Sequence, residues 1–271
     1  MLTGLLHLGR LVGIARSLAR HDALWPLEQV SRRFAPLRAC VWLLRVMFRR
    51  KRPGRPGERL AAAFADLGPS YVKLGQALSV RADLVGEDVA RDLELLQDGL
   101  DPFPTDQAIA TIEETLAMPL MQAFAQFDRD PVAAASIAQV HRATTLEGKD
   151  VAVKVLRPGI IKKFTRDIET YEWAAAHLEA LGGEAKRLRP ESVIANFRRW
   201  TMRELDLRRE AASASELAEH MAQVDQYEIP AIDWERTSGR VLTLDWVEGV
   251  KISNREGLIA AGHDLDAIAN R

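Results

Sequence analysis

The stretch AAASIAQVHRATTLEGKDVAVKV, residues 133–155, decides the fold class of this 271-residue chain. It contains two short segments rich in β-branched residues, 136–144 and 150–156, on either side of the turn sequence LEGK, and this pattern predicts a β-hairpin. A further apolar segment at 240–245 predicts another strand. We therefore expect a small antiparallel sheet.

Helix-forming segments lie on both sides of the hairpin. Before it they cover 58–67, 70–82, 86–97 and 105–117. After it they cover 161–181 and 190–222, each as one long helix, and a last helix starts near Ser253. The chain is expected to have an α+β fold with four regions: a basic N-terminal region and linker (1–57), a helical extension (58–130), the sheet with its helices (131–252) and a final segment (253–271).

The spacing within this stretch matches the N-lobe of protein kinases. There, G-x-G-x-x-G-x-V forms a loop over the nucleotide phosphates and is followed by the lysine of V-A-I-K. The loop glycines are alanines in this chain, and glycine is what lets backbone approach phosphates closely, so a nucleotide should be held less closely or in another pose. The candidate nucleotide-binding residues are Ala133, Ala134, Ala135, Ser136, Ala138, Val140, Ala152 and Lys154.

Lys154 is the candidate phosphate-binding residue. Because side chains alternate along a strand, Ala152 and Lys154 should face the side opposite to Val151 and Val153. VAVK alone favours an ordinary exposed lysine at a strand end. However, the alanine loop precedes Lys154 at the distance at which the glycine loop precedes the lysine in kinases. This spacing makes a nucleotide site the favoured interpretation.

The segment RELDLRREA offers carboxylates that could pair with Lys154. On one continuous helix, at 100° per residue, Asp206 and Glu210 share a face and Glu204 lies off it. Surface ion pairs with nearby arginines, such as Glu204 with Arg208, are the alternative interpretation and contribute little stability.

Another motif, KLGQ, lies at 73–76, with GPSYV before it and ALSVRAD after it. KLGQ, AAAS, QVH, VAVK and ELDLRREA follow one another in this order. Through these motifs, residues 58–271 resemble the UbiB/AarF family of atypical kinase-like proteins, which is associated with ubiquinone biosynthesis.

The resemblance implies a protein-kinase-like N-lobe capped by the helical extension, with ATP or ADP and Mg²⁺ as cofactors. The candidate catalytic residues that it implies are Lys73, Gln76, Lys154, Glu204, Asp206 and Glu210. Lys73 and Gln76 would lie over the place where a protein substrate enters. Glu210 would pair with Lys154.

The catalytic and metal-binding residues of a kinase belong to its C-lobe. No matching motif occurs here, because His263, Asp264, Asp266 and Asn270 have the wrong spacing. We therefore expect residues 253–271 to be the start of a truncated C-lobe and the rest of that lobe, with its Mg²⁺ ligands, to be missing from this chain. The chain should then have no metal site and no catalytic activity by itself.

Basic residues are concentrated near the N-terminus. Residues 1–60 carry 13 Lys/Arg against 3 Asp/Glu, although the whole chain has a formal net charge of −1. Around 41–52 they are interspersed with large apolar side chains, as in helices that lie on anionic membranes. Solvated arginines on a core helix explain the pattern equally well. We expect a cytoplasmic protein that associates peripherally with the inner face of the membrane through residues 1–57, since no apolar stretch is long enough to span it.

The sequence points to two functions and gives little support to a third. The first is the N-terminal part of a UbiB-type ATPase or kinase that works with ubiquinone-biosynthesis proteins or lipid precursors. The second is a non-catalytic module that binds a membrane surface and partners. Nucleic-acid binding is not expected, because no nucleic-acid motif accompanies the basic charge.

Overall fold

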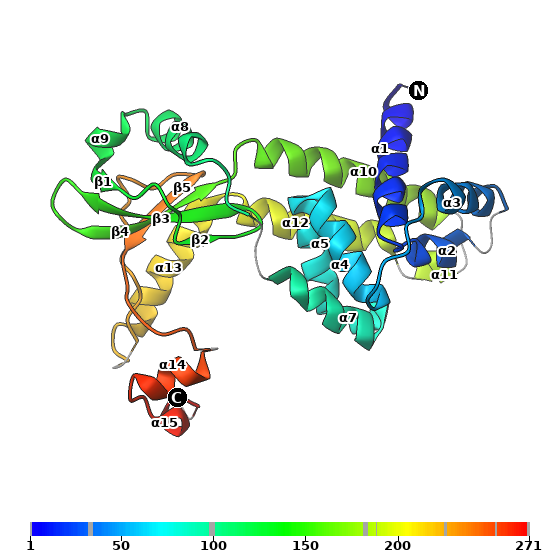
Figure 1. The fold of residues 1–271 in the computed structure, drawn as a ribbon. Coiled ribbons are helices and arrows are strands. Elements are labelled where there is room, and N and C mark those ends of the chain that lie inside the picture. The colour runs from blue at the N-terminus through cyan, green and yellow to red at the C-terminus, as the bar shows by residue number, and fades with distance from the viewer. Residues whose placement is uncertain are drawn as a thin grey trace.

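The computed structural model describes residues 2–31, 35–97, 101–180, 184–187, 189–224, 227–252 and 254–269. It has a helical part and a sheet part, and long helices connect them (Figure 1). The helical part contains α1 (Leu2–Arg20), α2 (Trp25–Ser31), α3 (Ala35–Phe48), α4 (Pro56–Leu67), α5 (Pro69–Ser79), α6 (Ala82–Val85), α7 (Glu87–Leu93) and η1 (Glu94–Gln97). The connecting helices are α10 (Ile160–Ala180) and α12 (Pro190–Glu204), with the short α11 (Glu184–Arg187) between them in sequence.

The sheet part contains β1 (Phe124–Phe127), β2 (Ala133–Ala134), β3 (Ala138–Thr145), β4 (Asp150–Leu156) and β5 (Val241–Asp245). Its helices are α8 (Thr105–Leu116), α9 (Leu120–Ala123) and α13 (Leu207–Met221). The last helices, α14 (Arg255–Ala260) and α15 (Leu265–Ala269), lie apart from the sheet (Figure 1). Ser253 itself lies outside the described residues, and the helix that we predicted to start near it is α14, which begins at Arg255 after its N-cap Asn254.

All paired strands are antiparallel, in the order β1-β3-β4-β5, and β2 also pairs with β3. The predicted hairpin is confirmed as β3 and β4, and the predicted strand at 240–245 is β5. The sequence did not predict β1, which pairs with β3, so the sheet begins before residue 131. The division into four regions stays a prediction.

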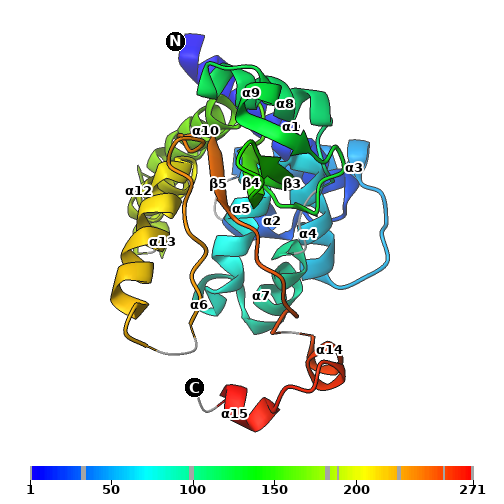
Figure 2. The same cartoon turned by 90° about the vertical axis from the view of Figure 1, so that its left-hand side faces the viewer.

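The two faces of the sheet have different neighbours. Val151, Val153 and Val155 are at most 1% exposed and pack with Phe124 in an apolar cluster under α8 and α9. The opposite face lies toward α13, as Figure 2 shows. The alternation predicted for β4 is therefore confirmed, and it leaves the Lys154 side chain on the α13 face.

The prediction of one helix over 190–222 was wrong. The chain forms α12 and α13, and the break falls at Leu205 and Asp206. Leu205 and Leu207 are both almost fully buried, and the Asp206 side chain caps α13 by accepting a hydrogen bond from Arg208 N at 3.3 Å. A straight helix would place the two leucines about 200° apart, so the break lets both enter the core.

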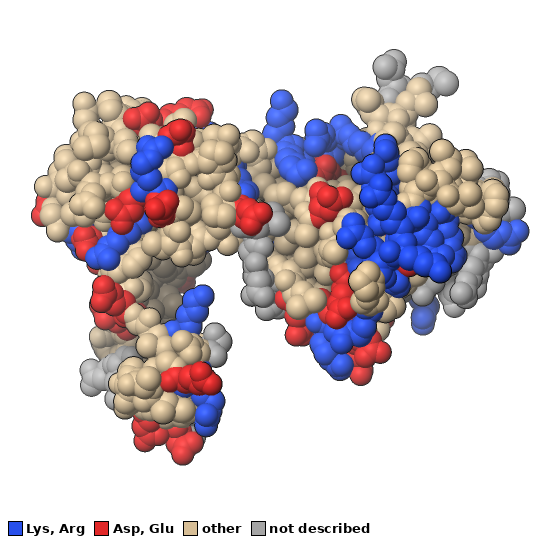
Figure 3. Space-filling model, in the orientation of Figure 1, with Lys and Arg blue, Asp and Glu red and all other residues tan. Residues whose placement is uncertain are grey.

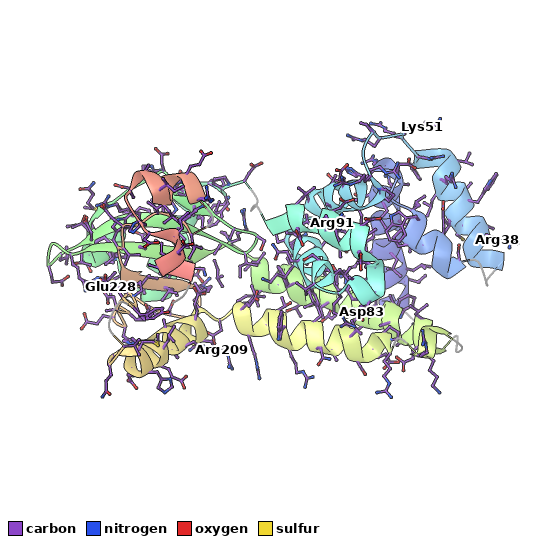
Figure 4. All side chains as sticks on the ribbon, turned by 90° about the horizontal axis from the view of Figure 1, so that it is seen from below. Arg38, Lys51, Asp83, Arg91, Arg209 and Glu228 are labelled. Atoms are coloured by element: carbon purple, nitrogen blue, oxygen red, sulfur yellow. The ribbon has the colours of Figure 1, made fainter. Side chains whose placement is uncertain are left out.

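The basic N-terminal helices are part of the main core. α1 packs on α4 and α10, and Leu18, Ala19 and Leu24 share an apolar cluster with Leu60 and Phe64. Seen from below, α10 and α12 run side by side from the sheet part along the helical part (Figure 4). Among the helices that the structure describes, none has the length and apolar character needed to cross a bilayer.

Candidate functional site

Strand register places three of the predicted nucleotide-binding residues in one row across the sheet. Ala133 is opposite Val140, Val140 is opposite Lys154, and Lys154 is opposite Leu242. Ala152 lies two residues before Lys154 and therefore on the same face. Residues from β2, β3 and β4 thus meet on the face that α13 approaches.

Lys154 is ion-paired with Glu210, as the resemblance implied. The Nζ atom lies 2.7 Å from both Oε atoms of Glu210, which comes from the first turns of α13. The two side chains are 24% and 50% exposed, so the pair lies at the surface of the sheet face and is reachable by a ligand. An ammonium group has three donors and can contact a phosphate oxygen beside this carboxylate.

The prediction that Asp206 and Glu210 share a helix face was wrong, because Asp206 precedes α13 as its N-cap. Its Oδ1 and Oδ2 atoms each lie 2.9 Å from the guanidinium of Arg208. This hydrogen bonding, together with the positive charge of Arg208, lowers the pKa of Asp206. Arg208 therefore pairs with Asp206, and the alternative pairing with Glu204 does not form.

Glu204, the last residue of α12, pairs with the extension. Its Oε2 atom lies 2.5 Å from the Nζ atom of Lys73 on α5. Glu204 and Glu210 are six positions apart and each holds a predicted site lysine. The α12–α13 junction thus connects the two ion pairs.

Gln76 forms a hydrogen bond within the helical extension. Its Nε2 atom donates to the carbonyl oxygen of Leu96 at 2.8 Å, which ties α5 to η1. Gly75, between Lys73 and Gln76, is buried where α5 packs on Phe64 and Leu96. The KLGQ motif therefore combines an ion pair from Lys73, close packing at Gly75 and a hydrogen bond from Gln76.

The other alanine-loop residues divide into two groups. Ala133 and Ala135 are exposed and Ala134 is half-buried, whereas Ser136 and Ala138 are buried. Ala138 is 1% exposed and belongs to the main apolar cluster. Residues 133–135 of the loop are thus accessible to a ligand, and the buried Ser136 and Ala138 anchor the loop to the core.

A buried polar network, which the sequence analysis did not predict, supports the loop from the opposite face of the sheet. Gln139 and His141 are fully buried. Because a carbonyl oxygen only accepts, His141 Nδ1 donates to Asp128 O at 2.9 Å, and its Nε2 accepts from Gln139 Nε2 at 2.8 Å. Burial lowers the pKa of His141, which favours this neutral ring. The QVH motif was the sequence signal.

The carboxylates near Lys154 do not form a free donor set for Mg²⁺. Glu210 is bound to Lys154, Glu204 to Lys73 and Asp206 to Arg208. Within the described ranges, no group of three or more His, Cys, Asp or Glu side chains is arranged to hold a metal ion. The placement of the Mg²⁺ ligands in a C-lobe stays a prediction.

A small antiparallel sheet whose strand lysine is ion-paired with a glutamate of the packed helix defines a protein-kinase-like N-lobe. Residues 95–271 match the ABC1 atypical kinase-like domain. The chain belongs to this family of atypical kinase-like proteins.

Two relatives extend the comparison. The chain is 43% identical over 215 residues to the probable protein kinase UbiB of Marinobacter nauticus, an alignment that covers 79% of this chain and 39% of that protein. It also matches the solved complex structure of Rv3197 with erythromycin from Mycobacterium tuberculosis, with 28% identity and a TM-score of 0.47. That match covers 72% of this chain and 49% of the other. The chain therefore spans less than half the length of either relative.

Proposed function

We propose that this chain forms the nucleotide-binding N-terminal part of a UbiB-type kinase-like ATPase that supports ubiquinone biosynthesis. The observation that carries the proposal is the Lys154–Glu210 pair at 2.7 Å, in the same strand row as Ala133 and Val140. Ubiquinone-biosynthesis proteins or lipid precursors are the proposed partners of the whole protein.

In this proposal each residue has a separate task. Lys154 donates to the phosphates, and Glu210 holds the ammonium in place. The exposed Ala133 and Ala135 lie over the phosphates. ATP would supply the transferable phosphoryl group, and this chain alone would bind it without turnover, because it has no match to the catalytic and metal-binding motifs of the C-lobe.

Nucleotide-induced stabilisation tests the proposal. A ligand that binds only the folded chain adds RT ln(1 + [L]/Kd), or about 2.7 kcal/mol at 100 Kd. For a chain of this size, that free energy corresponds to a rise in Tm of roughly 5–10 °C. We expect MgADP and MgATP to raise the Tm, whereas MgCl₂ with sodium phosphate does not. An unchanged Tm at millimolar nucleotide would contradict the proposal.

Membrane-surface binding is the second candidate function, and exposed apolar side chains on two touching helices favour it. The residues that are at least half exposed are Leu5, Leu6, Leu8 and Val12 on α1 and Trp42, Leu43, Val46 and Met47 on α3. Lys and Arg side chains gather over this end of the molecule (Figure 3), and Lys51 and Arg38 lie far from the sheet (Figure 4). Such a surface suits an anionic bilayer, with apolar side chains entering the interface.

Vesicle sedimentation tests this candidate. Replacing Arg50, Lys51 and Arg52 with glutamine should weaken binding to phosphatidylserine-containing vesicles by about 1 kcal/mol per residue, or roughly a hundredfold. Arg49 is left intact, because its Nε atom lies 2.6 Å from Asp22 Oδ1 and holds α3 to the core.

The matched control replaces three exposed cations of the sheet part and the last helices, Arg209, Lys251 and Arg255, with glutamine. It should leave vesicle binding unchanged. Binding that is equal on neutral phosphatidylcholine vesicles, or that does not weaken with added salt, would contradict the membrane function.

A further inference from the structure

Arg157, which follows β4, connects segments that are far apart in sequence. Its Nε and Nη2 atoms donate to the carbonyl oxygen of Ala135 at 3.2 and 3.0 Å. Its Nη2 atom also donates to the carbonyl oxygen of Asp101 at 2.7 Å. The guanidinium carbon lies 5.4 Å from the centroid of the Phe103 ring. One side chain thereby joins the alanine loop to the segment that leads into α8.

The main chain of Arg157 holds the same loop. Its N–H group donates to Ile137 O at 2.9 Å, and within the loop Ala135 N donates to Ala138 O at 2.7 Å. The carbonyl groups of Ala135, Ile137 and Ala138 are therefore all engaged. Two of these three contacts come from Arg157.

A second contact joins the segment before α8 to the far end of the loop. Phe103 N donates to Gln139 Oε1 at 3.0 Å, and Gln139 is fully buried. Residues 101–103 therefore connect to the alanine loop at two points. Arg157 bridges Asp101 to Ala135 at the start of the loop, and Gln139, just after the loop, accepts from Phe103 N. A surface loop of alanines has few side-chain contacts of its own, so these bonds fix its conformation.

We propose that Arg157 is a positioning residue that holds the alanine loop in the conformation that receives nucleotide, by anchoring it to residues 101–103. This role rests on the proposed nucleotide binding. A guanidinium has five donors in one plane, so it bridges two carbonyl groups and stacks on a ring at once. The compact ammonium of a lysine cannot make all three contacts. A loop held in advance loses less conformational entropy on binding.

Amide hydrogen exchange of the nucleotide-free chain tests the anchoring. In Arg157→Lys, exchange within residues 133–138 should accelerate about tenfold, the factor that corresponds to losing roughly 1.4 kcal/mol of local stability. Arg142→Lys is the matched control, because the Arg142 guanidinium also lies over a ring, 4.8 Å from the centroid of Trp246, and bonds to Asp150 away from the loop. It should leave exchange in 133–138 unchanged. Phe103→Leu removes the stacked ring, keeps an apolar side chain against the sheet cluster and leaves the Arg157 hydrogen bonds in place, so it should give a smaller acceleration.

Nucleotide titration of the same variants tests the consequence. We expect Arg157→Lys to raise the Kd for MgADP about tenfold, since the loosened loop must be ordered on binding. Unchanged exchange in Arg157→Lys would overturn the anchoring role. Faster exchange with an unchanged Kd would overturn the link to nucleotide. If the wild type binds no nucleotide, the proposed function and the positioning role for nucleotide both fail, while the exchange data still decide whether Arg157 anchors the loop.

Discussion

Replacing Lys154 with methionine is expected to abolish the nucleotide-induced rise in Tm. The substitution keeps the aliphatic stem and removes the ammonium group, which lies 2.7 Å from both Oε atoms of Glu210 on the accessible sheet face. Two of the three ammonium donors reach Glu210, which leaves one for a phosphate oxygen. A hydrogen bond from a charged donor contributes about 1.5–3 kcal/mol, so losing it together with the positive charge weakens binding by roughly a hundredfold. Thermal unfolding with and without MgADP measures the effect.

Two further variants separate this role from general effects of charge. Lys162→Met removes an exposed lysine on α10 and should leave nucleotide binding unchanged. Glu210→Gln keeps the ammonium of Lys154 but releases it from its partner, so binding should weaken about tenfold without disappearing. Equal stabilisation of the wild type and Lys154→Met by nucleotide would refute a phosphate-binding role.

The β3–β4 hairpin could be predicted because its pattern is local. The β-branched segments and the LEGK turn specify β3 and β4, and the alternation at Val151 to Lys154 fixes which side chains face α13. Register then brings Ala133, Val140 and Lys154 together without any long-range signal in the sequence. The order of five motifs in the sequence indicated the family. The match of residues 95–271 to the ABC1 atypical kinase-like domain confirms this prediction.

The helix break and β1 could not be predicted, because packing decides both. Residues 190–222 contain strong helix formers and, after Pro190, no glycine or proline, so periodicity alone favours one helix. The burial of Leu205 and Leu207 outweighs that preference. β1 is only four residues long and pairs with a strand that comes later in the chain. The sequence signal for the break was Asp206, a good N-cap.

Gly75→Ala is expected to destabilise the chain by about 1–3 kcal/mol, although alanine is the better helix former. A Cβ atom at this position would lie 2.3 Å from Leu96 Cδ1 and 2.8 Å from Phe64 Cδ2. Leu96 and Phe64 are 7% and 8% exposed, so neither can move aside without disturbing the core. Urea unfolding of the variant measures the loss as a lower midpoint.

Gly13→Ala is the matched control, because Gly13 also lies inside a helix and its Cβ atom would have no other heavy atom within 4 Å. There the higher helix propensity of alanine should stabilise the chain by about 0.5–1 kcal/mol. A Gly75→Ala variant as stable as the wild type would show that α5 can move away from η1. Such a movement would lengthen the bond from Gln76 to Leu96 O and displace Lys73 from Glu204, since all three motif residues lie on one turn of α5. The close packing at Gly75 is therefore what allows KLGQ to place its lysine at the α12–α13 junction.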